Sequence, residues 1–297
     1  MEMITGENDK GRRLDRILRK ALPDCSLSLI HRYLRQGKIK VNGKSAKAQD
    51  RPDCGSIISI HSMENTQNIP LSASNTQKMT PAPEILWQGN GLLAVNKPAG
   101  IAVHGPDSLD EIILRFLLGK LPPSLSFKPG PLHRLDKPSS GIVVFSTSIE
   151  GARLFSALLR ERKVRKTYLA ITEGIVSKNE IWEDVLVRDT KGKKTNLGVE
   201  NGKNAITKIM PVSVMENRTL IRAEIETGRT HQIRAQAAAH GYPLAGDKKY
   251  GGKKFLNSGK YAANFFLHAW KMEFLNYFIE APLPSGWPVF PEGDFPL

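Results

Sequence analysis

An abrupt change in composition at residues 63–83 constrains the fold of this 297-residue chain more than any other feature. The segment has the sequence MENTQNIPLSASNTQKMTPAP, which is rich in Asn, Gln, Ser, Thr and Pro and holds few large apolar groups. Such a composition buries too little apolar surface to fold by itself and is typical of a flexible linker. We therefore predict two folded units, residues 1–62 and residues 84–297, joined by a linker at 63–83.

Positive charge is concentrated in the first unit. The whole chain has a formal net charge of +14, and residues 10–62 hold thirteen Lys or Arg against four Asp or Glu. Apolar residues at helical spacing predict one helix that begins near Leu14 and a second that is capped by Ser26 or Ser28. A short basic strand then leads into an Asn42–Gly43 turn, and a further strand follows. The first unit is thus expected to be a small α/β domain edged with cations.

A soluble chain with this charge usually binds a polyanion, and the phosphate backbone of nucleic acid is the commonest one. We therefore interpret the first unit as an RNA-binding module, although a solvated charged face is the alternative. The residues predicted to contact RNA are Arg32, Arg35, Lys38, Lys40 and Lys44.

Several classes of protein are disfavoured by what the sequence lacks. It has no apolar run near the ~20 residues that a membrane span needs, and its N-terminus lacks the apolar core of a signal peptide. Its two cysteines, Cys25 and Cys54, form no Cys-x-x-Cys pair, which fits a reducing compartment. Its histidines show no metal-ligand spacing, and no Gly-rich phosphate loop is present. We expect a cytoplasmic monomer with no metal, no nucleotide cofactor and no membrane contact.

The second unit alternates apolar strands with few, irregularly placed helices. Residues 219–225 alternate between two faces, and residues 141–147 and 265–274 are further strand candidates. Residues 148–164 form an amphipathic pattern that predicts a helix. A regular β-α-β alternation is absent, so the predicted class is α+β, with a mixed, mainly antiparallel sheet and peripheral helices.

Three stretches of the second unit combine turn glycines, polar groups and abrupt strand ends. They are VNKPAGIAVH at 95–104, PLHRLDKPSSGIVVFS at 131–146, and ETGRTHQIRAQAAAHGYPLAGDKKYGG at 226–252. The second places one carboxylate, Asp136, between Arg134 and Lys137, immediately before a buried strand. Asp136 either caps a turn or is the working group of an active site.

The third stretch supplies a partner for this carboxylate. Thr230 is predicted to cap a helix, which places Arg229 where a strand ends and the helix begins. A guanidinium at that position can form a bidentate ion pair with a carboxylate. Tyr168, in KTYLA, is placed to stack on a flat ring, although an ordinary strand tyrosine is the commoner case. No second carboxylate is an obvious partner for Asp136, so the paired acids of glycosidases are not evident.

These segments together resemble the motif set of the RluA-type pseudouridine synthases. HRLDKPSSGIVVFS, VNKPAGIAVH, KTYLAITEG and TGRTHQIRAQAAAHGYPLAGDKKYG occur in the order of that family and cover roughly residues 85–290. The basic first unit resembles the small RNA-binding domain first described in a small-subunit ribosomal protein. One departure is Pro138-Ser139, where the family usually has an acidic residue and Thr, and we expect a local change in turn shape without loss of catalysis.

The resemblance implies an enzyme that isomerises uridine in RNA without a redox step or an energy input. It implies that Asp136 is the catalytic carboxylate, that Tyr168 stacks on the target base, and that Arg229 ion-pairs with the aspartate. Ile233 matches an apolar wall of the base pocket, and we expect Arg134 to occupy the space that the flipped base leaves. The remaining predicted substrate-binding residues are His133, Lys97 and Arg234.

The two-domain layout resembles enzymes that act on large-subunit (23S) ribosomal RNA, which is the predicted substrate. The alternatives are a transfer-RNA pseudouridine synthase and a non-catalytic RNA-binding or ribosome-assembly protein. The presence of Asp136, Tyr168 and Arg229 together argues against a non-catalytic protein. A nucleoside hydrolase would usually show an acid or metal cluster, and none is visible in the sequence.

Overall fold

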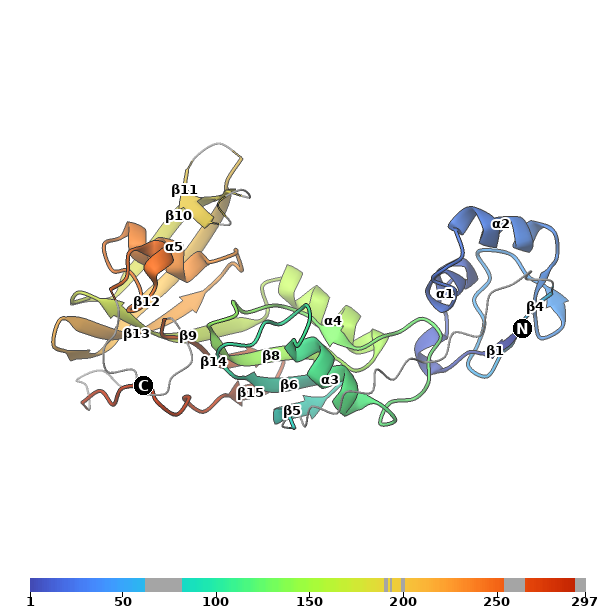
Figure 1. Ribbon diagram of the computed structural model, residues 1–297, viewed down its shortest axis with the longest axis horizontal. Coiled ribbons are helices and arrows are strands. Elements are labelled where there is room, and N and C mark those ends of the chain that lie inside the picture. The colour runs from blue at the N-terminus through green and yellow to red at the C-terminus, as the bar shows by residue number, and fades with distance from the viewer. Residues whose placement is uncertain (62–81, 190–191, 193, 199–200, 254–264, 292–297) are drawn as a thin grey trace.

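The structure is a computed structural model that describes residues 1–61, 82–189, 192, 194–198, 201–253 and 265–291. These residues form an elongated molecule, with the N-terminal unit at one end and a larger sheet-based unit beside it (Figure 1). The predicted linker, residues 63–83, lies outside the described residues except for its last two. Within the described ranges, no helix is long and apolar enough to cross a membrane.

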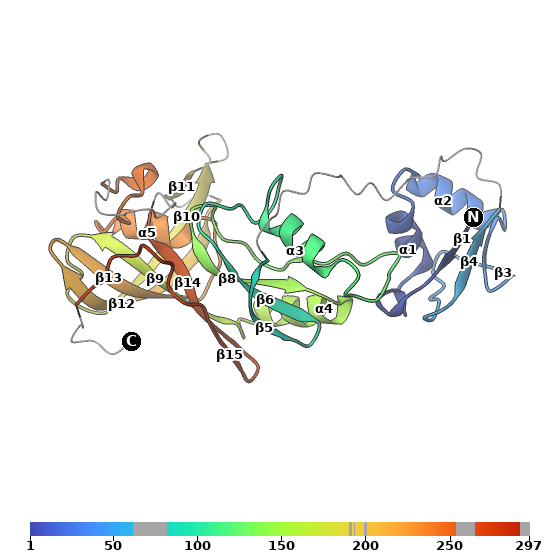
Figure 2. The same ribbon diagram turned by 60° about the horizontal axis from the view of Figure 1, so that its bottom comes forward.

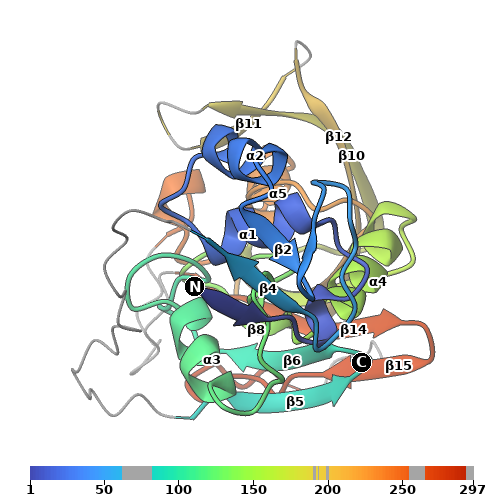
Figure 3. The same cartoon turned by 90° about the vertical axis from the view of Figure 1, so that its right-hand side faces the viewer.

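The N-terminal unit has two helices packed on a small antiparallel sheet, and in Figure 3 it faces the viewer. Its 3-10 turn is η1 (Glu7–Asp9) and its helices are α1 (Leu14–Ala21) and α2 (Leu27–Arg35). The sheet order is β1 (Glu2–Ile4), β4 (Ile57–Ile60), β2 (Ile39–Val41) and β3 (Lys44–Ser45).

Local sequence accounts for most of this unit. Ser26 Oγ accepts a hydrogen bond from the Leu29 amide at 3.2 Å, so Ser26 is the helix cap. Asn42 and Gly43 have φ angles of 49° and 79°, the left-handed pair that a tight hairpin turn requires. Strand β1, which pairs with β4, was not predicted.

The larger unit is built on a mixed sheet of eleven strands, which confirms the predicted α+β class. Its main path runs β11-β10-β12-β13-β9-β14-β8-β6-β5, with β15 beside β14 and β7 beside β8. Among the described strands, every pairing is antiparallel except that of β14 with β8. The strands are β5 (Glu84–Gly89), β6 (Leu92–Lys97), β7 (Gly130–Pro131), β8 (Ser140–Ser146), β9 (Arg165–Glu173), β10 (Glu180–Asp189), β11 (Lys194–Leu197), β12 (Lys203–Met215), β13 (Arg218–Ile225), β14 (Leu267–Phe274) and β15 (Tyr277–Glu280).

Helices cover both faces of this sheet (Figure 2). Alternate residues of β6 point to opposite faces, with Leu93 and Val95 in one core and Leu92 and Ala94 in another. Helices α3 (Leu109–Leu117) and α5 (Gln232–Ala239) contribute to the first core, and α4 (Ile149–Arg160) contributes to the second. The amphipathic pattern at 148–164 correctly predicted α4.

The parallel contact between β8 and β14 joins the two halves of the sheet. Gly141 of β8 pairs with Ala269 of β14, which also pairs with Tyr168 of β9. Gly141 has a φ of 105°, and a Cβ there would lie 2.2 Å from the Ala269 carbonyl oxygen, so only glycine fits the junction. The segment that precedes β8 and the middle of β9 therefore meet at one place in the sheet.

A buried histidine on β14, His268, forms hydrogen bonds at the same junction. His268 Nε2 lies 3.2 Å from the Ala281 carbonyl oxygen, and Ser140 Oγ lies 2.9 Å from Nδ1. A carbonyl can only accept, so Nε2 carries the proton and Ser140 donates to Nδ1. Burial lowers the pKa of His268 to about 4, which keeps the ring neutral and this arrangement fixed.

Candidate active site

A cleft opens where the segment before β8 passes strand β9 and the start of helix α5. It consists of two adjoining cavities of about 70 and 220 Å³. Both are lined by Arg134, Asp136, Tyr168, Ile225, Arg229 and His231. Three of the sequence motifs, far apart in the chain, thus converge on one cleft, whereas the stretch 95–104 supplies none of its lining residues.

Asp136 is held in this cleft by a buried arginine. Arg234 Nη1 donates to Asp136 Oδ2 at 2.7 Å, and the two side chains are 7% and 18% exposed. The same guanidinium donates from Nε and Nη2 to the two oxygens of Asp247, at 2.7 and 2.9 Å. Asp247 is 2% exposed, so it fixes Arg234 through a bidentate pair while one Nη remains for Asp136.

Two aromatic rings pack against the guanidinium group of Arg234. Its guanidinium carbon lies 4.3 Å from the centre of the Phe265 ring and 5.0 Å from that of Tyr250. A planar guanidinium suits this setting, because it stacks on rings through its faces while its edges donate hydrogen bonds. Burial lowers the pKa of Arg234, but Asp247 and Asp136 outweigh burial and raise it, so the group stays cationic.

The prediction that Arg229 pairs with Asp136 is wrong for this structure, because Arg234 makes that ion pair. Arg229 lines the cleft, but its Nε donates to the Asn204 carbonyl at 3.2 Å. The error came from the predicted helix start. Thr230 does not cap α5: its hydroxyl accepts from Arg188, and the cap position is His231, with the helix beginning at Gln232. Arg234 therefore lies in the first turn of α5 and points into the cleft.

His231 has an unusual backbone and faces the same carboxylate. Its φ is 54°, a left-handed conformation that is uncommon for a residue with a side chain and often marks a functional site. Nε2 lies 3.7 Å from Asp136 Oδ1, and Nδ1 is hydrogen-bonded to the Tyr250 hydroxyl at 2.9 Å. Burial lowers the pKa of His231 despite the opposing charge of Asp136, which favours a neutral ring near neutral pH.

Tyr168 forms one side of an apolar slot in the cleft. The residue is 8% exposed, and the smaller cavity is also lined by Ile225, Ile233 and Leu267. Burial raises the pKa of Tyr168 above its ordinary value, and the nearby Asp136 raises it further, so the phenol stays neutral. A neutral aromatic ring between aliphatic side chains is a suitable surface for a flat base.

Lys97 was predicted to bind substrate, but it is not among the residues that line the two cavities of the cleft. Its side chain is fully buried, and Nζ donates to the carbonyl oxygens of Pro98, Ile101 and Lys137 at 2.9, 2.7 and 3.2 Å. Burial lowers its pKa to about 7, and Asp136 acts in the opposite direction. Because Lys137 adjoins Asp136, Lys97 supports the loop that carries the carboxylate.

Three cations, Arg134, Lys166 and Arg229, line the larger cavity. Arg134 is exposed and lines both cavities. His133 borders the larger cavity, but its Nε2 accepts the Val144 amide at 3.0 Å. Burial lowers the pKa of His133 to about 3, so its ring is neutral and bonded to β8.

The cations predicted to contact RNA in the N-terminal unit lie on α2, the following loop, β2 and β3. Arg32, Arg35 and Lys44 are exposed, whereas Lys38 and Lys40 are half-buried. Lys38 Nζ lies 5.1 Å from the centre of the Tyr33 ring, a cation–π contact. This surface combines exposed positive charge with one aromatic ring.

Sequence analysis missed several residues of the site, and three of them hold or face its charged groups: His231, Asp247 and Tyr250. All three lie within the stretch 226–252 that was singled out for its turn glycines. Asp247 is the acid of LAGDKKYGG, between two turn glycines, and that position was a usable signal. The contact between Tyr250 and His231 joins segments that only the fold brings together.

Comparison with known proteins now decides the family. The family model described as RNA pseudouridylate synthase matches residues 91–239, and an S4 domain model matches residues 12–57. The chain belongs to the RNA pseudouridylate synthase family. The first match contains most of the cleft, including Asp136, Tyr168 and Arg234.

Individual relatives of this synthase agree over nearly its whole length. It is 30% identical to a ribosomal large subunit pseudouridine synthase C of Vibrio vulnificus, covering 95% of this chain and 91% of that one. It is 32% identical to the protein of the same name from Rickettsia bellii, with 90% and 91% covered. The solved structure of human RNA pseudouridylate synthase domain containing 4 matches with a TM-score of 0.57 and 24% identity, covering 68% and 89%, which supports the fold.

Proposed function

We propose that this enzyme converts uridine to pseudouridine in large-subunit ribosomal RNA, with Asp136 as its catalytic residue. The observation that carries the proposal is the pairing of Asp136 with the buried Arg234 at 2.7 Å, beside the apolar slot of Tyr168. The substrate rests on the names of the relatives from Vibrio vulnificus and Rickettsia bellii, both ribosomal large subunit pseudouridine synthases.

The reaction moves the ribose from N1 to C5 of the same uracil ring, so no atom or electron is gained or lost overall. The bond from C1′ to N1 breaks, the bond from C1′ to C5 forms, and one proton leaves C5 while another is taken up at N1. The site therefore has to hold a detached ring close to the ribose and direct a carboxylate at the sugar.

The cleft has a part for each of these tasks. In the proposal the uracil lies on Tyr168 against Ile225 and Ile233, and Asp136 reaches the ribose from the rim of the slot. A uridine has to leave its stack to enter, at a cost of a few kcal/mol. Arg134, which is exposed, is our candidate to occupy the vacated space, and Arg229 and Lys166 are candidates for phosphate contacts.

The proposal assigns separate roles to separate parts of the chain. Residues 1–62 form the RNA-binding module, residues 63–83 link it, and residues 84–297 form the catalytic domain. We infer a monomer without a nucleotide cofactor that works in the cytoplasm, where its ribosomal RNA substrate is found. Transfer RNA is the competing substrate, and the named relatives favour ribosomal RNA over it.

The test is pseudouridine mapping in ribosomal and transfer RNA from cells that lack this protein, with wild type or Asp136→Asn returned. We expect discrete sites in large-subunit RNA to disappear and only wild type to restore them, because asparagine keeps the size of the side chain but not its charge. Loss of sites in transfer RNA alone would move the substrate to that class. Restoration by Asp136→Asn would mean that another residue does the chemistry.

A further inference from the structure

The N-terminal unit is fastened to the catalytic unit by one buried carboxylate. Asp9 of η1 is fully buried, and its oxygens accept hydrogen bonds from the amides of Leu125 and Ser126 at 2.8 and 2.9 Å. The hydroxyl groups of Ser124 and Ser126 also donate to it. Four donors of a loop more than a hundred residues away thus converge on this side chain.

The contact around Asp9 is closely packed. Asn8 Oδ1 accepts the Ile149 amide at 2.8 Å, which ties η1 to the first turn of α4. Leu125 packs against the core of the N-terminal unit. A Cβ at Gly6 would lie 1.8 Å from the Pro123 carbonyl oxygen, so the two backbones touch. The orientation of the module is therefore set by these contacts, independently of the segment at 63–83.

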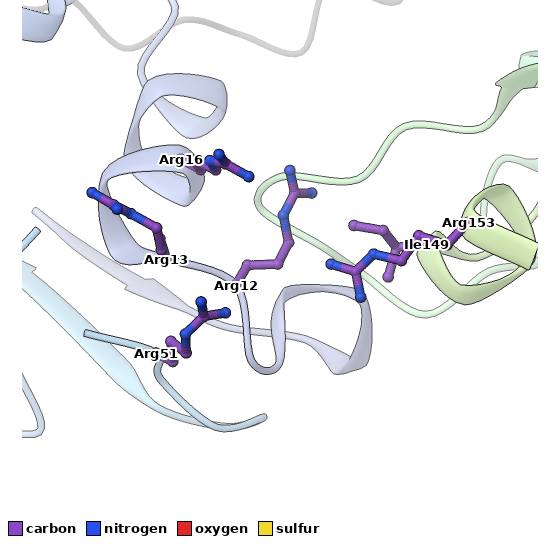
Figure 4. Close-up of a pocket in the computed structure, with 6 residues that line it drawn as sticks. All are labelled: Arg12, Arg13, Arg16, Arg51, Ile149 and Arg153. Atoms are coloured by element: carbon purple, nitrogen blue, oxygen red, sulfur yellow. The ribbon is translucent and has the colours of Figure 1, made fainter. Parts of the chain in front are cut away.

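Docking creates a cavity of about 560 Å³ between the two units, and five arginines line it (Figure 4). Arg12, Arg13, Arg16 and Arg51 come from the N-terminal unit, and Arg153 comes from α4 of the catalytic unit. Ile149 is the remaining lining residue. The close-up shows the side chains of Arg12 and Arg153 approaching one another across the gap (Figure 4).

Little of this charge is neutralised by the protein. Asp15 pairs with Arg13 through two hydrogen bonds of 2.7 and 3.1 Å. Arg12 donates to the Ser126 carbonyl and Arg51 to the Gly11 carbonyl, which leaves both positive. Within the described part of the chain, Arg16 and Arg153 form no ion pair.

Converging guanidinium groups repel one another unless an anion lies between them. Burial lowers the pKa of Arg12, and the nearby Arg153 and Arg16 lower it further against the opposing effect of Asp9. Guanidinium is the side-chain group that best matches phosphate oxygens, because it presents paired donors in a plane. An open cavity rimmed by such groups on a synthase of RNA fits the phosphodiester backbone.

The geometry points to this cavity, which we call the seam site, as a binding site for consecutive phosphates of the RNA backbone. The inference rests on the proposed function, since it takes the ligand to be the RNA substrate. The seam site needs Arg153 from one unit and Arg12 and Arg16 from the other, so it exists only when the units are docked. Docking thereby makes one continuous RNA-binding surface from two domains.

The test compares two double charge reversals in the full chain. Arg16→Glu with Arg153→Glu alters the seam site, and Arg19→Glu with Arg160→Glu is the matched control. The control residues are exposed, lie on the same helices α1 and α4, and are not among the cavity-lining residues. Affinity for an in vitro transcript of large-subunit ribosomal RNA is measured at several salt concentrations, together with pseudouridine formation at saturating RNA.

We expect the seam variant to bind the RNA roughly 10-fold to 100-fold more weakly. The slope of the logarithm of the binding constant against the logarithm of salt concentration should become shallower by ~1.4, because two contacts to single-stranded phosphates are lost. The maximal rate should stay near that of wild type, and the control should lose much less affinity. Equal losses in both pairs would mean general charge attraction, and no loss in the seam pair would mean no site, so either result overturns the inference. A wild-type chain that forms no pseudouridine would instead refute the proposed function.

Discussion

The docked arrangement of the two units depends on Asp9, so we expect Asp9→Asn to release it. Asparagine has the same shape but offers one acceptor oxygen where the carboxylate offers two. In the wild type, the Gly6 and Leu125 amides donate to Asp9 Oδ2 at 2.9 and 2.8 Å. The asparagine orientation that loses fewer hydrogen bonds places its side-chain nitrogen at this position, facing the two amides. Both of these hydrogen bonds are lost, and the remaining three lose the charge that strengthens them.

The structure sets the size of this effect. Gly6 belongs to the N-terminal unit itself, so only the bond from Leu125 joins the two units. A hydrogen bond to a charged group contributes about 1.5–3 kcal/mol, which is the loss of docking free energy that we expect. A tenfold change in an equilibrium constant is about 1.4 kcal/mol, so opening of the contact should become ~10- to 100-fold more frequent. The Leu125 amide, which is now bonded to Asp9, should report that opening directly.

Hydrogen exchange followed by mass spectrometry measures this opening. Peptides that cover residues 123–127 should exchange at least ~10-fold faster in Asp9→Asn, while peptides from β9 and β13 stay protected. Glu7→Gln is the matched control, because it removes one charge from an exposed position of the same 3-10 turn. Unchanged protection at 123–127 would refute the role of Asp9, and equal loss throughout the sheet would indicate general unfolding instead.

The same carboxylate predicts a pH dependence of docking. Burial raises the pKa of Asp9, but hydrogen bonds from Ser126, Gly6, Leu125 and Ser124 outweigh it, and the pKa lies below the ordinary 3.8. The undocked chain thus takes up the proton first as the pH falls. Docking should be fully stable above the ordinary value and should weaken as the pH falls through the lowered pKa of the folded state. Exchange at residues 123–127 should show this loss in wild type and not in Asp9→Asn.

Three further predictions concern the site and the module. Arg234→Lys should lower turnover about 10- to 100-fold with little change in RNA affinity. The reason is that one ammonium group cannot form a bidentate pair with Asp247 and also reach Asp136. Turnover equal to wild type would contradict this prediction. Lys97→Met should cost about 3 kcal/mol of unfolding free energy through three unsatisfied carbonyls, measured by urea denaturation. The unfolding free energy of the wild type should also rise with pH between about 7 and 10.5, because in this range Lys97 is protonated in the unfolded chain and largely neutral in the folded one. Lys97→Met should lack this rise of unfolding free energy with pH. Deletion of residues 1–83 should leave slow turnover on a small RNA but weaken binding and its salt dependence, and failure of the remainder to fold would contradict the predicted boundary.

Local sequence was sufficient wherever a short segment controls its own conformation. The hydrophobic spacing of α1 and α4, the Ser26 cap and the Asn42–Gly43 turn follow from neighbours a few residues apart. Strands β8, β13 and β14 of the catalytic unit followed from alternation and from buried runs such as Gly141 to Phe145, whereas β10, β11 and β12 were not predicted. Four motifs in a fixed order also carried the family, because each is itself a short segment.

The partner of Asp136 could not be predicted in the same way. Both Arg229 and Arg234 were visible in GRTHQIR, and the choice between them depended on where the helix starts. The structure places His231 in a left-handed conformation at the cap, which a Thr230 cap does not produce. Arg234 lies in the first turn of the helix that follows His231 and donates to Asp136 and Asp247, and neither acid is near it in the sequence.

The sequence by itself determined the fold class, the family and the carboxylate at the centre of the site. Only the tertiary structure decided that Arg234 holds Asp136, that Lys97 is buried beneath the loop, and that Asp9 docks the N-terminal unit. The physical reason is the same in each case. A local pattern fixes the backbone of its own segment, whereas a buried charge has to be satisfied by whichever distant donors and acceptors the fold brings within hydrogen-bond reach.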